Sequence, residues 1–410
     1  MAEAVTNRRV LAIALPIMLS NVTIPILGVV DTGVVGQLGE AAPIGAVGIG
    51  AVILSAVYWL FGFLRMGTAG LVAQAPGAGD AAETGALLMR ALLIAAAAGL
   101  GFILLQVPIF WGAFQLAPAS AEVESLAQSY LSIRVWGAPA AIGLYALTGW
   151  LIAQERTRAV LIIQVWMNGL NIVLDMLFVL GFGWGVEGVA VATLIAEISG
   201  AALALWFCRA AFRGDQWTDW ARILDRGKVK RMMSLNLDIM LRSILLETAF
   251  LSFLFFAADL GDVALAANQI LLQFLHVTAY ALDGFAFAAE ALVGQAIGGR
   301  SLTRLRRSVW MTSQWGVVIA VCLTVMFWLA GPPVIDLMTT SQDVRDEAAR
   351  YLPWLIWAPV LGLAAYMLDG IFIGATRGRD LRNAMLMSAG VYWLCVLMLL
   401  EPYGNHGLWA

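Results

Sequence analysis

Long apolar segments separated by short polar connections recur along all 410 residues of the chain. A transmembrane helix needs roughly 20 consecutive, predominantly apolar residues. Eleven segments are long and apolar enough, and several exceed that length, which favours tilt or extension into the cytoplasm. The segments lie near residues 10–36, 44–75, 86–112, 125–154, 159–182, 186–211, 230–258, 262–298, 305–331, 347–375 and 381–400. The pattern predicts an all-α polytopic membrane protein.

Composition supports this prediction. Hydrophobic residues make up 61% of the chain and charged residues 12%, and the mean hydropathy is +0.85. These values exclude an ordinary soluble domain. The net charge of −3 does not indicate nucleic-acid binding, because the basic residues are concentrated in the loops between apolar segments.

Short motifs recur about 220 residues apart, in the same order, with the spacing of an internal repeat. Leu38-Gly39-Glu40 matches Leu260-Gly261-Asp262, Leu71-Val72-Ala73-Gln74 matches Leu292-Val293-Gly294-Gln295, Ala138-Pro139 matches Ala358-Pro359, and Arg156-Thr157-Arg158 matches Arg377-Gly378-Arg379. We therefore expect two lobes, residues 1–212 with spans 1–6 and residues 230–410 with spans 7–11, joined by a cytoplasmic loop at residues 213–229. Six spans per half is an even number, so both halves enter from the same side and are related by a pseudo-two-fold axis normal to the membrane.

The repeat also indicates where the second half departs from the first. Residues 185–188 open the sixth span, and the matching residues 404–407 are followed only by the chain end at Ala410. The last helix of the second lobe is missing from this sequence, so we expect a fragment that ends at the start of span 12.

The distribution of Lys and Arg predicts the orientation. With the N-terminus in the cytoplasm, most basic residues of the loops fall inside, and the opposite loops carry only Arg345 and Arg350. Cytoplasmic loops are enriched in Lys and Arg. We expect a multi-pass protein of the cytoplasmic (inner) membrane with its N-terminus inside.

Three polar positions of the first half share one depth. Asp31 lies near the outer end of span 1, Asp175 in the outer half of span 5, and Thr193 in the outer half of span 6. An ionisable residue inside a membrane span is by default a functional candidate. At 100° per residue, Asn168, Asn171 and Asp175 form one polar stripe within about 60°. Thr193 and Glu197 are aligned in the same way on span 6.

Such a group of oxygen-bearing side chains suits a coupling ion. Burial and a neighbouring carboxylate both favour the protonated carboxyl group, so the cluster can hold a proton. It can equally hold a hard cation, because hard cations take oxygen ligands. The alternative is that these side chains only satisfy one another between packed helices.

The second half carries a looser set of acidic residues. Asp238 and Arg242 are four residues apart on span 7, which predicts an intrahelical ion pair, and Glu247 points to the opposite side of that helix. Asp283 and Glu290 share a face of span 8, and Asp369 lies toward the inner half of span 10. The pair of Asp238 and Arg242 is expected to be structural. The candidates for the cavity wall or for second-lobe coupling, with a buried structural role as the alternative, are Asn168, Glu197, Glu247, Asp283, Glu290 and Asp369.

Two prolines, Pro16 and Pro25, lie inside span 1. Proline removes a helical hydrogen bond and bends the helix. A bent helix that carries Asp31 is a candidate moving part, and a static kink is the alternative.

The residues placed above resemble the multidrug and toxic compound extrusion (MATE) family, and specifically its DinF branch. The resemblance covers nearly the whole chain, and its most specific motifs lie at residues 15–16, 28–32, 63–66, 168–175, 238–243, 278–285, 368–377 and 404–406. It implies two six-helix lobes, a V-shaped central cavity, and export of amphipathic, often cationic compounds in exchange for H⁺ or Na⁺.

The resemblance also implies roles for particular residues. The residues that carry the coupling ion in the family correspond here to Asp31, Asn171 and Asp175, the span 6 threonine to Thr193, and the proline of the conformational kink to Pro16.

Two other functions make different demands on the sequence. A flippase for a lipid-linked intermediate would need a basic cavity, and the intramembrane Arg65, Arg134 and Arg242 are scattered in the sequence. An enzyme or ATP-driven pump would need metal ligands, a nucleophile–base pair or a phosphate-binding loop, and the chain has no HExxH and no Walker A motif. We therefore predict a secondary transporter rather than an enzyme. We expect it to be a monomer whose partners are drug-like substrates and the lipid bilayer, with no cofactor or metal beyond the coupling ion.

Overall fold

The computed structural model describes residues 4–37, 40–116, 119–213 and 217–410, apart from the side chains of residues 26, 27, 29 and 32, and within these ranges it is helical without a strand. The helices of the first half are α1 (Asn7–Gly36), α2 (Ala41–Leu60), α3 (Phe63–Gly77), α4 (Ala81–Leu104), α5 (Gln106–Leu116), α6 (Ala121–Arg134), η1 (Val135–Gly137), α7 (Ala138–Ala153), α8 (Thr157–Asp175), η2 (Met176–Gly181), α9 (Gly185–Phe207) and η3 (Arg209–Phe212). They are followed by α10 (Trp220–Ile223), α11 (Arg226–Asp259), α12 (Asp262–Gly298), α13 (Leu302–Met338), α14 (Gln342–Gly374), α15 (Gly378–Tyr403) and α16 (Asn405–Trp409).

Eleven segments of the described chain are long and apolar enough to cross a membrane, which confirms the all-α polytopic prediction. Several predicted spans consist of more than one helical piece. Span 2 combines α2 and α3, and span 4 combines α6, η1 and α7. Span 5 continues from α8 into the π-helix η2 directly after Asp175. Single-turn π segments inside helices are frequent at functional sites.

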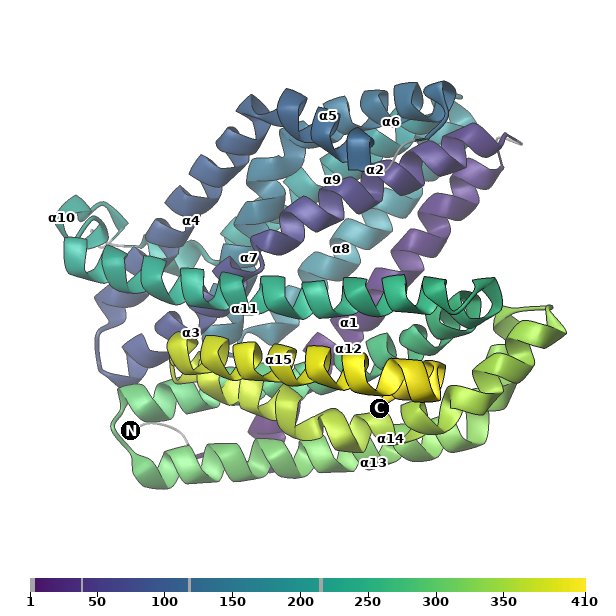
Figure 1. Cartoon of the computed structure of the whole chain (residues 1–410). Helices are drawn as coiled ribbons and strands as arrows, with labels where there is room; N and C mark the ends of the chain where they lie inside the picture. Colours follow the sequence, from purple (N-terminus) through teal and green to yellow (C-terminus); the bar gives the residue numbers. More distant parts are fainter. Residues whose placement is uncertain (1–3, 38–39, 117–118, 214–216) are drawn as a thin grey trace.

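Figure 1 shows the helices of the two sequence halves as two groups that run at an angle to each other. They meet mainly where α12 packs against α3 and α1, and where α11 packs against α3. Helix α11 begins at Arg226, four residues before the predicted boundary of the second lobe, because Asp225 caps it by accepting a hydrogen bond from the Lys228 amide. Residues 214–216 of the predicted linker, and Leu38-Gly39 of the repeat, lie outside the described residues. The lobe boundaries and the symmetry axis stay predictions.

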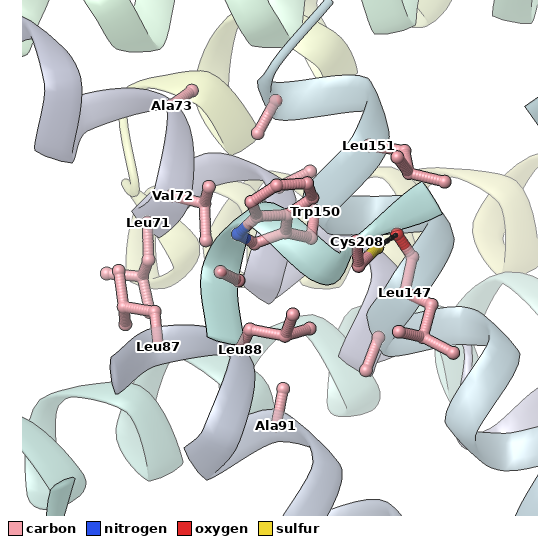
Figure 2. Close-up of a cluster of buried hydrophobic side chains, with 14 of the residues drawn as sticks. Leu71, Val72, Ala73, Leu87, Leu88, Ala91, Leu147, Trp150, Leu151 and Cys208 are labelled. Atoms are coloured by element: carbon pink, nitrogen blue, oxygen red, sulfur yellow. Dashed lines mark hydrogen bonds between the residues drawn. The ribbon is translucent and has the colours of Figure 1, made fainter. Parts of the chain in front are cut away.

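A cluster of buried apolar side chains holds first-half helices together on the side predicted to face the cytoplasm (Figure 2). It joins residues of α3, α4 and α7, including Leu71, Leu88 and Trp150. Trp150 is 4% exposed, and its Nε1 donates a hydrogen bond to the carbonyl of Thr84 at 3.2 Å. The indole therefore fills the core without leaving its polar atom unpaired.

Glycine allows α3 and α12 to approach backbone to backbone. A Cβ atom on Gly298 would lie 2.0 Å from the carbonyl oxygen of Gln74, and one on Gly77 would lie 2.3 Å from the carbonyl oxygen of Gln295. Gln74 and Gln295 are matching positions of the internal repeat, and so are Gly77 and Gly298. The interface between the two halves therefore rests on a reciprocal pair of glycines.

Because α3 and α12 are so close, adding one methyl group at Gly298 should destabilise the protein. Gly298→Ala should lower the free energy of unfolding by about 1–3 kcal/mol, because α3 and α12 must separate to admit the Cβ atom. Thermal unfolding of the purified protein in detergent measures the change. Gly390→Ala is the matched control, since a Cβ atom on Gly390 meets nothing within 4 Å. Equal stability of the two variants would contradict the packing described here.

Candidate functional site

Three helices bring the predicted first-half residues together. Asp31 lies on α1, Asp175 ends α8, and Thr193 lies on α9. Helix α1 packs against both α8 and α9, and α8 packs against α9. Three positions widely separated in the sequence therefore lie on helices that pack against one another.

Asn171 is held by a hydrogen bond to α9. Its Nδ2 donates to Thr193 Oγ1 at 3.1 Å, and Thr193 Oγ1 donates to the carbonyl of Val189 at 2.9 Å. Asn171 is 1% exposed. With its amide nitrogen fixed on Thr193, the buried Oδ1 of Asn171 has no hydrogen-bond partner among the described residues.

The carboxyl groups of Asp31 and Asp175 lie close enough to interact electrostatically. Asp175 is fully buried. Within the described part of the chain, neither oxygen of Asp175 has a hydrogen-bond partner, and the same holds for Asp31 Oδ1. Four oxygens, three from carboxyl groups and one from the Asn171 amide, are thus buried without a donor. Burying a charge without a partner is costly, so this arrangement favours a bound proton or a hard cation.

The nearest basic side chain is already occupied. Arg134 of α6 donates to both oxygens of Glu197 on α9, at 2.7 and 2.9 Å. A bidentate pair of this kind is strong and geometrically specific. Arg134 lies within electrostatic reach of Asp31 and Asp175, but its guanidinium is engaged by Glu197. Arg134 is not among the residues predicted for this site; the available signal in the sequence is an arginine inside an apolar segment.

Asn168 ties the same stripe of α8 to α1. Its Nδ2 donates to the carbonyl and to Oγ1 of Thr23, at 3.0 and 2.9 Å, and its Oδ1 accepts from Gln164 Nε2 at 3.0 Å. Thr23 precedes Pro25 by two residues. Asn168 therefore anchors α1 near a proline, one turn away from Asn171. Its partner Thr23 is not among the residues predicted for this site.

The second-half acids form a separate group between the two halves. Arg65 of α3 pairs with Glu290 of α12 at 3.4 Å and stacks over the ring of Phe287 at 3.9 Å. Arg242 of α11 pairs with Asp369 of α14 at 2.7 Å. Asp283 lies within the electrostatic field of both arginines. Three carboxylates thus share two guanidinium groups.

The predicted intrahelical pair of Asp238 and Arg242 is wrong. Asp238 instead accepts from Arg382 of α15 at 2.5 Å, and Arg242 turns to Asp369. Partners on neighbouring helices are closer than the partner one turn away, so tertiary packing overrides the i,i+4 spacing. Glu247 is exposed on α11 and has no ion pair within the described ranges.

The chain is similar to membrane transporters over most of its length. The MatE family model matches residues 16–177 and 239–396. DNA damage-inducible protein F of Escherichia coli K12 is 41% identical, over 97% of this chain and 86% of that protein. Probable multidrug resistance protein NorM of Acinetobacter baylyi is 26% identical, over 96% of this chain and 89% of that protein.

Solved structures share the fold. An outward-facing MATE family multidrug resistance transporter of the MOP superfamily superposes with a TM-score of 0.89 at 20% identity, over 98% of this chain and 91% of that chain. A MATE transporter in the bent conformation superposes with a TM-score of 0.84 at 19% identity, over 99% of this chain and 93% of that chain. By the family model and the identity to DNA damage-inducible protein F, the chain belongs to the MATE family of multi-pass membrane transporters.

Proposed function

We propose that this MATE protein is a secondary antiporter that exports amphipathic, cationic compounds in exchange for H⁺ or Na⁺. The coupling ion binds at Asp31, Asn171, Asp175 and Thr193. The proposal is supported by relatives that bear the name multidrug resistance protein. We further propose that the transporter works as a monomer in the cytoplasmic membrane, with its N-terminus inside.

One observation carries the proposal. The oxygens of Asp175, Asp31 Oδ1 and Asn171 Oδ1 are buried without a hydrogen-bond donor in the described chain. A proton on one carboxyl group would give the pair its missing donor. A hard cation would instead take these oxygens as ligands. Either kind of ion changes the charge of the cluster when it binds or leaves.

Helix α1 is the element that can pass this change to the interface between the halves. It carries Asp31, and its inner part packs tightly on α12: a Cβ atom on Gly284 would lie 2.8 Å from the carbonyl oxygen of Ala14. Pro16 follows Ala14 by two residues and leaves a backbone carbonyl of α1 without its helical donor. Repacking of α1 around the loaded or empty cluster therefore alters contacts with the second half. The ion and the exported compound then weaken each other's binding by the same factor.

The arrangement of the intramembrane arginines disfavours a flippase for a lipid-linked intermediate. Such a protein needs free cations in its cavity to hold a pyrophosphate. Arg65, Arg134 and Arg242 each pair with a carboxylate, Glu290, Glu197 and Asp369 respectively. Their charges are compensated within the protein.

Asp31→Asn should abolish gradient-driven efflux while leaving folding largely intact. The neutral amide mimics the loaded cluster permanently, so the ion gradient no longer drives the cycle. Efflux of a cationic dye from membranes that hold equal amounts of protein measures the effect. Asp336→Asn, which changes an exposed carboxylate at the end of α13, is the matched control and should transport at the wild-type rate. Wild-type efflux by Asp31→Asn would remove this residue from the mechanism.

The coupling ion is identified by imposing the two gradients separately. Inverted vesicles with only a pH gradient, or only a Na⁺ gradient, should accumulate the dye under one of them, and Asp175→Asn should abolish that accumulation. ATP without either gradient should drive no uptake once the proton pump of the vesicles is inhibited. Uptake that persists without both gradients would contradict antiport.

Glu197→Gln should impair transport even though Glu197 does not contact the ion. The variant frees Arg134 beside Asp31 and Asp175, and the guanidinium then competes with the coupling ion. Removing one partner of a buried ion pair also costs about 3–5 kcal/mol of stability. Ion affinity and thermal unfolding measure the two effects. The double variant Glu197→Gln/Arg134→Gln should recover much of the ion affinity; failure to recover it would assign the defect to structure alone.

A further inference from the structure

Two groups of side chains close the side of the molecule that is predicted to face the cytoplasm, and they occupy matching positions of the repeat. In the first group, Arg9 pairs with Glu155, and Gln295 bonds to both. In the second, Arg231 and Gln74 both bond to Thr376 and to each other. Each group joins the N-terminal part of one half's first helix to a glutamine of the other half. We name them the first clasp (Arg9, Glu155, Gln295) and the second clasp (Arg231, Thr376, Gln74).

The backbone shows that Glu155 and Thr376 are equivalent positions. Both follow the end of a membrane helix, and both have a positive φ, 56° and 53°. In each case the residue's amide donates to the carbonyl three residues before it, at 2.9 Å from Glu155 and 2.8 Å from Thr376. A β-branched residue with positive φ is uncommon, so the repeat geometry, not the residue type, sets the conformation of Thr376.

The two clasps differ in charge at this position. In the first, the carboxylate of Glu155 neutralises Arg9, with a bond to Arg9 Nε at 2.7 Å. In the second, Thr376 offers Arg231 only a neutral oxygen at 3.4 Å, beside the Gln74 oxygen at 3.3 Å. Arg231 therefore lacks the carboxylate that its counterpart has.

A cavity of about 480 Å³ opens beside the second clasp, between the start of α11 and the turn that joins α14 to α15. Lys230, Arg231 and Arg379 line it without a carboxylate partner in the described chain. The two acids that line it are taken: Asp238 is paired with Arg382 and Asp380 with Arg377. The cavity therefore presents net positive charge.

We propose that this cavity binds a phosphate-bearing anion, which supplies the negative charge that Glu155 supplies in the first clasp. The chemistry is that of a phosphodiester or phosphate monoester held by one lysine and two arginines. Basic pockets at the cytoplasmic ends of membrane helices bind anionic lipid headgroups. Met233 and Leu237, 49% and 52% exposed, continue along α11 from the cavity and offer an apolar surface on which acyl chains can lie. A soluble phosphate compound is the other source of the same chemistry.

The experiment is a titration of the purified protein in neutral detergent with short-chain phosphatidylglycerol, and separately with glycerol phosphate. Lys230→Gln/Arg379→Gln should weaken binding about 30-fold, since each basic side chain near an anionic surface contributes about 1 kcal/mol and a factor of ten is about 1.4 kcal/mol. The matched control is Arg8→Gln/Arg158→Gln, which changes the corresponding residues of the first half and should leave the affinity unchanged. Binding of the lipid alone identifies a headgroup site supported by the acyl chains, and equal binding of both ligands identifies a site for phosphate itself.

A second variant keeps every basic residue and tests whether a carboxylate in the second clasp can take the place of the bound anion. Thr376→Glu places a carboxylate at the position that corresponds to Glu155 of the first clasp. Glu155 already adopts the same positive-φ backbone conformation as Thr376. It should weaken binding of either ligand by competing for Arg231, while Thr376→Gln should weaken it much less. Absence of binding by the wild-type protein, equal loss in the Arg8→Gln/Arg158→Gln control, or unchanged binding by Thr376→Glu would each overturn the proposal. These readouts measure binding only, so they stand apart from the proposed antiport.

Discussion

A charge inside an apolar helix bundle must find a partner, and this requirement organises the polar interior of the protein. Three arginines within the membrane segments meet it through carboxylates on other helices, as in the bidentate pair of Arg134 and Glu197. These pairs also fix which helices are neighbours. The carboxyl groups of Asp31 and Asp175 differ, because the nearest guanidinium is already engaged and their buried oxygens face no donor in the described chain. At the candidate site, the buried carboxyl oxygens thus lack a partner, and a bound ion can provide it.

Helix α1, which carries Asp31, links the candidate site to the interface between the halves. Asn168 holds α1 at Thr23, and tight packing at Gly284 holds it against α12. On the side predicted to be cytoplasmic, the reciprocal contacts of Gly77 and Gly298 keep α3 and α12 together. The first clasp joins α12 to α1, and the second joins α3 to α11. A change of charge at Asp31 therefore acts on a first-half helix that also packs against the second half.

Local patterns predicted the spans and the polar stripe, because helix length and the 3.6-residue period depend on neighbouring residues only. The spacing of Asn168, Asn171 and Asp175 predicted one polar stripe, and the structure adds that Asn168 bonds to α1 and Asn171 to α9. The ion-pair partners of charged residues could not be predicted in this way. Asp238 and Arg242 have suitable intrahelical spacing, yet each pairs with a side chain more than 100 residues away in the sequence. The two clasps could not be predicted either, although their glutamines occupy matching positions of the repeat. Only the folded chain shows that Gln295 bonds to Glu155 and Gln74 to Thr376.

The most direct test of ion coupling at Asp31 and Asp175 is to count the ions that leave when a compound binds. Ethidium is added to purified protein in weak buffer, and the released H⁺ and Na⁺ are followed with a pH indicator and a sodium electrode. The account predicts that dye binding releases one of the two ions from the wild-type protein and none from Asp31→Asn/Asp175→Asn. Dye binding without ion release by the wild-type protein, or equal release by the double variant, would contradict it.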